Sequence, residues 1–356
     1  MCNGSETSAQ IKPTAMGYFE KPAGVRVAPY ICDASEAHEI AKKHFHPGES
    51  SCPGDSWWVT ARPVAFSCRP LTIVNIGANK GYYVAFFLSM LAPSLNIHPS
   101  SIFPLIQSVT GLDSGCGVCD DCKLGAFISG SSNFCTTGDG RVVKSEDFGL
   151  DIHAIEPVDA NIDLLKLGVE TLVKRSDSKT VRVHLHKAAV QGDPLLESVP
   201  FNLCSAGTEV CGILLENRAT KREEMQIDVV PAITVDTMNE KLGTDINVID
   251  FLAIDAEGTD PDIIDGAEQM IKSGHVRLLE FEYNSMRKWE SISLESIINK
   301  LDGWGFECFQ MQKDTLVRLT RCWDPAYETK RWSNVLCVHT SDETMLHALS
   351  GYIPRV

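Results

Sequence analysis

Short apolar runs alternate with amphipathic stretches and polar turns along most of the chain. The clearest run, Leu71 to Ile76, breaks at two glycines, Gly77 and Gly81, and apolar residues resume from Tyr82 to Leu88. This pattern predicts a buried strand, a tight turn and a buried helix. Glycine in such a turn lets the backbone approach a ligand, and the positive end of the next helix favours a carboxylate or a phosphate. The glycines alone fit an ordinary strand-to-helix turn equally well.

The rest of the chain continues this alternation of strands and helices. Strands are expected at residues 151–156, 181–186, 229–235, 248–255, 276–283, 306–310 and 335–339, and helices at 34–46, 82–92, 158–172, 237–242, 261–271 and 294–301. The alternation predicts an α/β fold with a doubly wound, mostly parallel sheet. Ligands of such sheets bind outside the carboxyl ends of the strands, which is where Gly77, Glu156 and Asp255 fall.

The spacing of these motifs predicts the domain organisation. In dinucleotide-binding folds an acidic residue follows the glycines by about 20 residues, whereas Glu156 lies 75 positions after Gly81. We therefore expect an insertion at 93–149 between the first helix and the second strand. The predicted units are an N-terminal extension at 1–70, the main domain at 71–340 and a C-terminal tail at 341–356.

Composition narrows the class of protein. The chain has 356 residues, 44% of them apolar, and a formal net charge of −15, which argues against non-specific binding to nucleic acid or to an anionic membrane. Its longest apolar run, Tyr82 to Ala92, is too short to cross a bilayer, and its first residues do not resemble a secretion signal. We expect a cytoplasmic protein with no nucleic-acid or membrane partner.

The 13 cysteines fall into two groups. Nine are scattered singly, among them Cys32, Cys322 and Cys337, and are interpreted as free thiols of a reducing compartment. The other four lie together in the insertion, where thiolates at this spacing can hold a structural zinc ion; free thiols, local disulfides or an iron–sulfur cluster are the alternatives. They are Cys116, Cys119, Cys122 and Cys135. We expect this cysteine-rich insertion to act as a staple or a lid.

Five blocks together resemble the FkbM-type methyltransferases, in the same order along the chain. The likeness covers Leu71 to Val338 without the insertion, and its blocks are Ile76–Tyr82, Ala154–Pro157, Lys187–Val190, Thr234–Asp236 and Ile254–Gly258. The resemblance implies a class I methyltransferase fold, which is Rossmann-like, and S-adenosylmethionine as cofactor. It also implies O-methylation of a sugar or polyketide-like hydroxyl, so that the partner is a small-molecule or glycan acceptor.

The resemblance also implies roles for individual residues. Glu156 would bind the ribose hydroxyls, and Ala188 or Ala189 would lie near the adenine. The methionine end of the cofactor would be lined by Gly77, Ala78, Asn79 and Gly81. Asn75 is also expected to contact the cofactor. The chain departs from the family at three places: Asn75 stands where an aspartate is common, Ala253 where a lysine is frequent, and Asp260 where a glutamate is frequent.

Transfer of a methyl group to an alcohol requires removal of the hydroxyl proton. Asp255 and Glu257 lie two residues apart after a strand, so one can act as general base and the other can orient the acceptor. Alternatively, a divalent cation held by Asp255, Glu257 or Glu282 would acidify the hydroxyl. A structural role is the alternative for Glu257 and the expected one for Glu282. His184 and His186 are expected to be packing residues.

Two other functions fit parts of the pattern. A non-catalytic protein with the same fold would dock a partner through the cysteine-rich insertion. A nicotinamide-dependent oxidoreductase would explain the acidic residue after the second strand, but the turn lacks the third glycine of that fingerprint. Binding of S-adenosylmethionine or of NAD separates these hypotheses.

Overall fold

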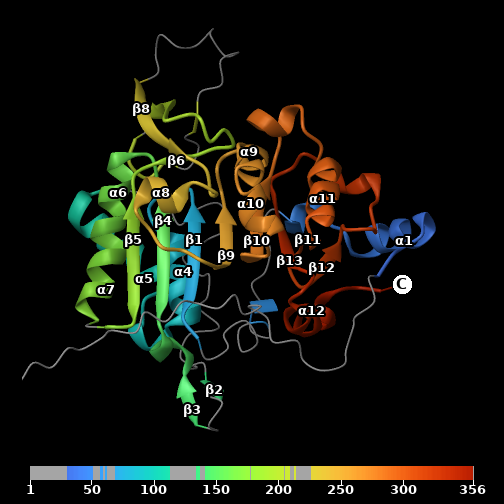
Figure 1. The fold of residues 1–356 in the computed structure, drawn as a ribbon, viewed down its shortest axis with the longest axis horizontal. Helices are drawn as coiled ribbons and strands as arrows, with labels where there is room; N and C mark the ends of the chain where they lie inside the picture. The colour runs from blue at the N-terminus through green and yellow to red at the C-terminus, as the bar shows by residue number, and fades with distance from the viewer. Residues whose placement is uncertain are drawn as a thin grey trace, which may run out of the picture.

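The computed structural model describes residues 30–50, 57–58, 61, 69–112, 134–136, 141–176, 178–203, 205–208, 212–213 and 226–355. An eight-stranded sheet forms its centre, in the order β12-β11-β13-β10-β9-β1-β4-β5 (Figure 1). Its strands are β1 (Leu71–Ile76), β4 (Leu150–Ile155), β5 (Val181–His186), β9 (Ile249–Ile254), β10 (Val276–Tyr283), β11 (Phe306–Met311), β12 (Leu316–Arg318) and β13 (Ser333–His339).

The middle of the sheet is parallel and one edge is antiparallel. β1 pairs in parallel with β4 and β9, β4 with β5, and β9 with β10, whereas β10–β13, β13–β11 and β11–β12 are antiparallel. The predicted α/β fold with a large, mostly parallel sheet is therefore confirmed. The carboxyl ends of β1, β4, β5 and β9 all point toward the top of Figure 1.

Helices cover both faces of the sheet because successive strand residues point to opposite sides. One face packs against α4 (Tyr82–Leu91), α5 (Pro99–Thr110), α6 (Asp159–Leu165) and α12 (Glu343–Leu349). The other face packs against α1 (Ala34–His44), α8 (Met238–Leu242), α9 (Asp260–Asp265), α10 (Glu268–Lys272) and α11 (Leu294–Gly303). Short elements complete the main unit: α2 (Pro47–Ser50), η1 (Pro93–Leu95), η4 (Lys166–Glu170), α7 (Thr171–Arg175), η6 (Arg287–Glu290), η7 (Pro325–Tyr327) and η8 (Ser350–Tyr352).

A second, three-stranded sheet lies above the carboxyl ends of the central strands (Figure 1). It contains β6 (Ala189–Val190), β7 (Ser198–Leu203) and β8 (Gln226–Ile233). β8 runs parallel to β6 and antiparallel to β7. This sheet places Ala189 and Phe201 near the end of the main sheet where ligands are expected.

The predicted insertion contains both core and peripheral structure. Helix α5 contributes Ile102 and Ile106, which are both 0% exposed, to the core. The hairpin β2 (Phe134–Thr136) and β3 (Val142–Lys144), followed by η3 (Ser145–Phe148), lies at the amino ends of the strands, at the bottom of Figure 1. The described part of the insertion is therefore not a lid over the carboxyl ends.

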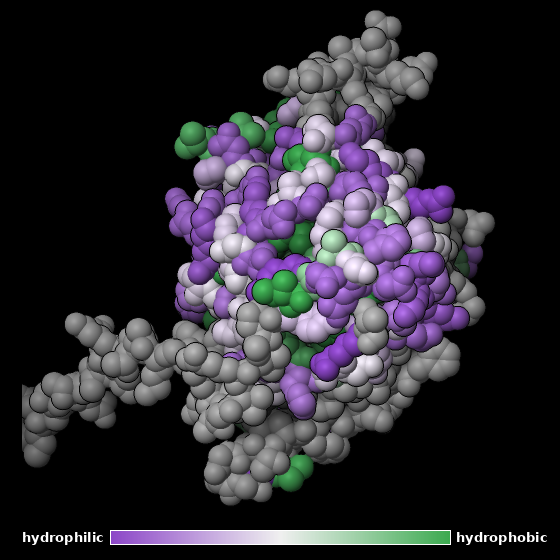
Figure 2. Space-filling view, turned by 90° about the vertical axis from the view of Figure 1, so that its right-hand side faces the viewer, coloured by the Kyte–Doolittle hydropathy of each residue, from purple (hydrophilic) through white to green (hydrophobic). Residues whose placement is uncertain are grey.

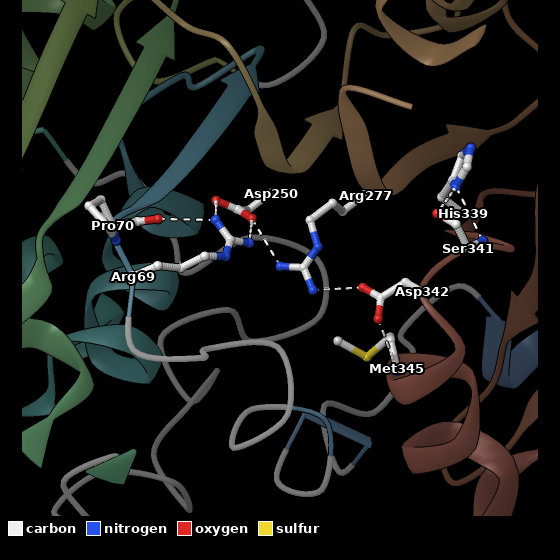
Figure 3. A network of polar contacts seen from close by, with 8 residues as sticks. All are labelled: Arg69, Pro70, Asp250, Arg277, His339, Ser341, Asp342 and Met345. Atoms are coloured by element: carbon white, nitrogen blue, oxygen red, sulfur yellow. Dashed lines mark hydrogen bonds and ion pairs between the residues drawn. The ribbon is translucent and has the colours of Figure 1, made fainter. Parts of the chain in front are cut away.

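A network of buried ion pairs ties together the amino ends of the central strands (Figure 3). Asp250, at the second position of β9, accepts hydrogen bonds from Arg69, from Arg277 (3.0 Å) and from the Thr72 amide (2.9 Å). Arg277 also donates to Asp342 (2.7 Å), which caps α12 through the Met345 amide. The positive charges of two arginines therefore neutralise the negative charges of two aspartates at this end of the sheet.

Two disulfides correct the interpretation of the scattered cysteines as free thiols. Cys32 pairs with Cys322 across a sequence separation of 290, and Cys308 pairs with Cys337 between the neighbouring strands β11 and β13. Positions scattered along the sequence meet in the fold, so their spacing concealed the pairing. Disulfides persist mainly in oxidising compartments, and the cytoplasmic location stays a prediction.

The surface is predominantly polar on the face that Figure 2 shows, with apolar side chains in small separate areas. None of the helices in the described ranges has the length and apolar character needed to cross a membrane.

Candidate functional site

The glycine turn after β1 lies where three strands end. The amides of Gly77 and Ala78 both donate to the Ile155 carbonyl of β4 (3.0 and 3.1 Å), and the Asp255 amide donates to Ile76 (3.0 Å). Gly77 has φ +79°, and a Cβ atom there would lie 1.7 Å from the carbonyl oxygen of Asp255. Only glycine fits this position. The turn therefore joins the ends of β1, β4 and β9 closely.

Gly81 starts helix α4 in the left-handed conformation, with φ +93°. A Cβ atom there would lie 2.7 Å from both Leu165 and Val169. The helix thus begins against the core, and its amino end faces the same edge of the sheet as the turn. The predicted strand, turn and helix are confirmed.

Glu156 follows β4 and reaches the glycine turn. Its Oε2 accepts from the Asn79 amide (2.9 Å), and its Oε1 accepts from the Val158 amide (2.9 Å) and from Asn161 Nδ2 (3.3 Å). The side chain is 4% exposed, and burial raises the pKa of its carboxyl while these hydrogen bonds lower it. A carboxylate oxygen has two lone pairs, so Oε2 can accept one further hydrogen bond.

A cavity of about 340 Å³ opens between these elements. Its walls include nine of the residues assigned from the sequence: Gly77, Ala78, Asn79, Gly81, Glu156, Ala188, Ala189, Asp255 and Glu257. This volume and the mixture of apolar and polar walls are typical of a small-molecule site.

Asn75 is the one predicted cofactor-binding residue that does not line this cavity. It lies within β1 between Ala154 and Ala253 and is 1% exposed. Neither its amide nitrogen nor its amide oxygen has a hydrogen-bond partner within the described part of the chain. Buried polar atoms without partners are uncommon, and Asn75 lies one residue before the end of the strand that leads into the glycine turn.

The acidic side of the cavity lies after β9. Asp255 is exposed, and Glu257 adopts φ +54°, so the chain turns here rather than remaining extended. The turn continues through Gly258, where a Cβ atom would lie 2.5 Å from the Met286 carbonyl. Both acidic side chains nevertheless line the cavity.

Two further carboxyls, whose roles sequence reasoning did not find, lie behind this turn. Asp260 is fully buried, and its oxygens accept from the amides of Gly258 (3.1 Å) and Glu282 (3.3 Å) rather than capping the helix that follows. Burial, with the charge of Asp255, raises the pKa of Asp260 to about 7. Glu282 lines the cavity, and burial and the neighbouring acids raise the pKa of its carboxyl well above the ordinary range.

A hydrogen-bonded group of three residues supports the wall beside Glu282. Tyr83 lines the cavity, and its hydroxyl donates to Glu280 Oε2 (2.6 Å). Asn334 Nδ2 donates to the other oxygen of Glu280 (2.9 Å). Burial raises the pKa of Tyr83, so this hydroxyl stays protonated and acts as a donor. The sequence did not indicate a role for Tyr83 in the site, because a tyrosine within an apolar run is expected to be a core residue.

The metal predictions find no support in the described residues. No group of three or more His, Cys, Asp or Glu side chains there could hold a metal ion. This includes the acids Asp255, Glu257 and Glu282. Cys116, Cys119 and Cys122 lie outside the described residues, and only the backbone of Cys135 is described. Zinc in the insertion therefore stays a prediction.

His153 of β4 forms a stack with the two histidines of β5 outside the cavity. The rings of His153 and His184 lie 4.6 Å apart, and His153 Nδ1 lies 3.0 Å from His186 Nε2. His184 also contacts Asp151 (3.0 Å), a partner that the sequence did not indicate because it comes from the neighbouring strand. Burial lowers the pKa of His153 to about 4. These contacts agree with the packing role expected for His184 and His186.

A cavity at the carboxyl edge of a parallel sheet, with a glycine turn and a carboxylate in its walls, defines a class of α/β proteins that bind small-molecule ligands. Residues 125–308 match the model of the methyltransferase FkbM domain. The chain belongs to the FkbM methyltransferase family. The glycine turn precedes the matched segment and is joined to it through the pairing of β1 with β4 and β9.

One solved structure is similar to the chain: the methyltransferase FkbM from Methylobacillus flagellatus KT, with 14% sequence identity and a TM-score of 0.35. The likeness covers 77% of this chain and 44% of that protein, so the chain spans less than half of its length. No curated protein matches the chain.

Proposed function

We propose that the chain is an S-adenosylmethionine-dependent methyltransferase that acts on a hydroxyl of a small molecule or a sugar. The observation that carries this proposal is the hydrogen bond between the Asn79 amide and Glu156 (2.9 Å), which brings the glycine turn and the acid after β4 onto one cavity. A cofactor with an amino-acid end and a ribose requires these two groups side by side.

The residues present fit this cofactor. The backbone of Gly77 comes as close to its neighbours as glycine alone permits, and the amino end of α4 supplies the dipole that favours the cofactor's carboxylate. The spare lone pair of Glu156 suits a ribose hydroxyl. Ala188 and Ala189 are both buried and small, which leaves room for the adenine ring.

The charge of the cavity favours this cofactor over NAD. Among the described residues its lining carries four carboxyl side chains, of Glu156, Asp255, Glu257 and Glu282, and one lysine, Lys80. S-adenosylmethionine carries a net positive charge, whereas the pyrophosphate of NAD is an anion. An acidic cavity attracts the first and repels the second.

In the proposed reaction S-adenosylmethionine supplies the methyl group as a sulfonium. The chain's own task is to hold the acceptor oxygen close and aligned, which accounts for most of the rate of an in-line displacement. Asp255 and Glu257 are the proposed general base and orienting residue, and the proton of the acceptor hydroxyl passes to a carboxylate. The roles proposed for these two residues rest on their exposure to the cavity.

The remaining walls support an acceptor with both polar and apolar surface. Phe201, Ile213, Met286 and Trp332 provide apolar faces, and Thr208 and Asn284 provide hydrogen-bonding groups. A sugar ring or a polyketide-like molecule presents C–H surface and hydroxyls together. A panel of such acceptors with methyl-labelled S-adenosylmethionine would test O-methylation, read out as a labelled methyl ether.

Calorimetric titration tests use of the cofactor. Wild-type protein is expected to bind S-adenosylmethionine and not NAD. Glu156→Gln is expected to weaken binding about 10- to 100-fold, because a hydrogen bond to a charged group contributes about 1.5–3 kcal/mol. Glu295→Gln, an exposed position on α11, is the control and should bind normally. Tight binding of NAD would contradict the proposal. Failure to bind either ligand would also contradict it and would favour a non-catalytic docking protein.

A further inference from the structure

One buried carboxyl of the cavity has an oxygen that the protein does not use. Glu282 lies on β10 and is 7% exposed. Its Oε2 accepts from Asn284 Nδ2 (2.9 Å), and Oε1 has no hydrogen-bond partner within the described ranges. Neither Glu282 nor Asp260 forms an ion pair with a lysine or arginine of the described chain. A desolvated carboxylate without a cation is unfavourable, so a ligand that brings positive charge would be stabilised here.

The groups around Glu282 are mostly acidic. Asp255 and Glu257 approach it from the turn after β9, and Asp260 approaches from the start of α9. Among the described residues, the titratable and charged groups that act on Glu282 or lie beside it are Asp255, Glu257, Asp260, Glu280 of β10, Tyr83 of α4 and Arg287 of η6; Lys288 of η6 pairs instead with Asp262 of α9. Arg287 donates to the carbonyl of Glu257, and Tyr83 donates to Glu280. Within the part of the wall that the structure describes, the acids therefore outnumber the cations.

We propose that Glu282, with Asp260 behind it, makes the cavity selective for the charge of its ligand, so that a sulfonium donor binds more tightly than the neutral thioether left after methyl transfer. This inference rests on the proposed function and adds a specificity residue to it. Loss of the methyl group removes the positive charge from sulfur, which weakens the attraction to the wall. The wall thereby retains the donor and favours release of the product.

The protonation of Glu282 makes this selectivity depend on pH. Burial and the surrounding acids raise the pKa of its carboxyl, so at low pH the side chain is neutral and attracts no cation. As the pH rises, the carboxylate forms and the preference for a cationic ligand grows. Binding of a cation also favours the ionised form, so the protein releases a proton when such a ligand binds near neutral pH.

Three ligands test the proposal without an acceptor: S-adenosylmethionine, sinefungin and S-adenosylhomocysteine. Sinefungin carries a cationic amine beside the position of the sulfonium, whereas S-adenosylhomocysteine is neutral there. At pH 8 we expect both cationic ligands to bind wild-type protein about tenfold more tightly than the neutral one, which corresponds to about 1.4 kcal/mol. Titrations in two buffers of different ionisation enthalpy should report proton release for the cationic ligands alone.

Substitutions locate the effect at Glu282. Glu282→Gln should bring the three affinities close together, and the control Glu295→Gln should retain the preference. Glu295 is exposed on α11 and does not line the cavity. If Glu282→Gln fails to fold, titrations of wild-type protein between pH 6 and pH 8.5 test the proposal. The preference for cationic over neutral ligands must then increase with pH.

The outcomes distinguish this inference from the proposed function. Equal affinities of wild-type protein for the three ligands, or an unchanged preference in Glu282→Gln, would overturn the charge selectivity and leave the proposed cofactor intact. Failure of all three ligands to bind would overturn the proposed function, and this inference with it.

Discussion

The two ends of strand β9 differ in the charged groups that surround their aspartates, which are the buried Asp250 at the amino end and the exposed Asp255 after the carboxyl end. At the amino end, Asp250 contacts Arg69 and Arg277, and Arg277 contacts Asp342 (Figure 3). At the carboxyl end, Asp255 lies beside Asp260, Glu282 and Glu257, which are all acids. At the first end the acids are paired with the protein's own arginines, whereas at the second end acids outnumber cations among the described residues that line the cavity. The ion pairs at the first end stabilise the fold, and we propose that the second end binds a ligand.

The largest expected effect comes from breaking the balanced end. Arg277→Ala leaves Asp250 and Asp342 buried without this partner, and unpairing a buried charge costs about 3–5 kcal/mol. Urea denaturation should show this loss, whereas binding of S-adenosylmethionine by the folded protein should be unchanged. The control Arg182→Ala, at an exposed pair with Asp151, should cost no more than about 1 kcal/mol. Equal losses in the two variants would show that the buried network is not structural.

The next largest effect is expected at the glycine turn. Gly77→Ala introduces a methyl group that would lie 1.7 Å from the Asp255 carbonyl, and it also requires φ +79°. We expect destabilisation by about 2–4 kcal/mol from strain and clash, together with loss of S-adenosylmethionine binding.

Gly243→Ala is the matched control for this change. Gly243 has φ +65°, but no atom lies within 4 Å of the added Cβ, so strain alone should cost about 1 kcal/mol. Binding should be retained. Normal binding by Gly77→Ala would contradict the assignment of the turn to the cofactor site.

The smallest effect is expected from removing charge at the acidic end. The pKa of Glu282 is raised above its value in the unfolded chain, so the folded state holds the extra proton and stability falls as the pH rises through the folded pKa. Glu282→Gln should therefore be more stable than wild type at pH 8, by about 1.4 kcal/mol for each unit of the shift, and equally stable below the unfolded pKa. Denaturation at pH 4 and pH 8 measures this difference. If Glu282→Gln were less stable than wild type at pH 8, the Glu282 carboxylate would have to be stabilised by other groups of the folded protein.

Much of the fold could be predicted because the elements carry strong local patterns. The strand at 276–283 is continuously apolar apart from Arg277 and two glutamates, and the structure gives β10 the same bounds. The helix predicted at 261–271 is instead divided into α9 and α10. The reason lies elsewhere in the chain: the Asp236 carboxylate accepts from the amides of Gln269 and Met270 and thereby starts a new helix.

The site residues that directly follow strands could be predicted from the sequence, whereas those brought together by contacts between distant residues could not. Glu156 and Asp255 follow apolar strands, so their place at one edge follows from parallel topology. The roles of Glu280 and Asp260 depend on contacts with Tyr83 and Glu282 that no spacing in the sequence reveals. The disulfide between Cys32 and Cys322 was missed for the same reason.

The most direct test of the central claim is a crystal structure of the protein with S-adenosylhomocysteine. We predict that the ribose hydroxyls will lie within hydrogen-bonding distance of Glu156 and that the amino-acid end will lie against the turn from Gly77 to Gly81. A ligand bound elsewhere, with the cavity between β1, β4 and β9 empty, would contradict the account.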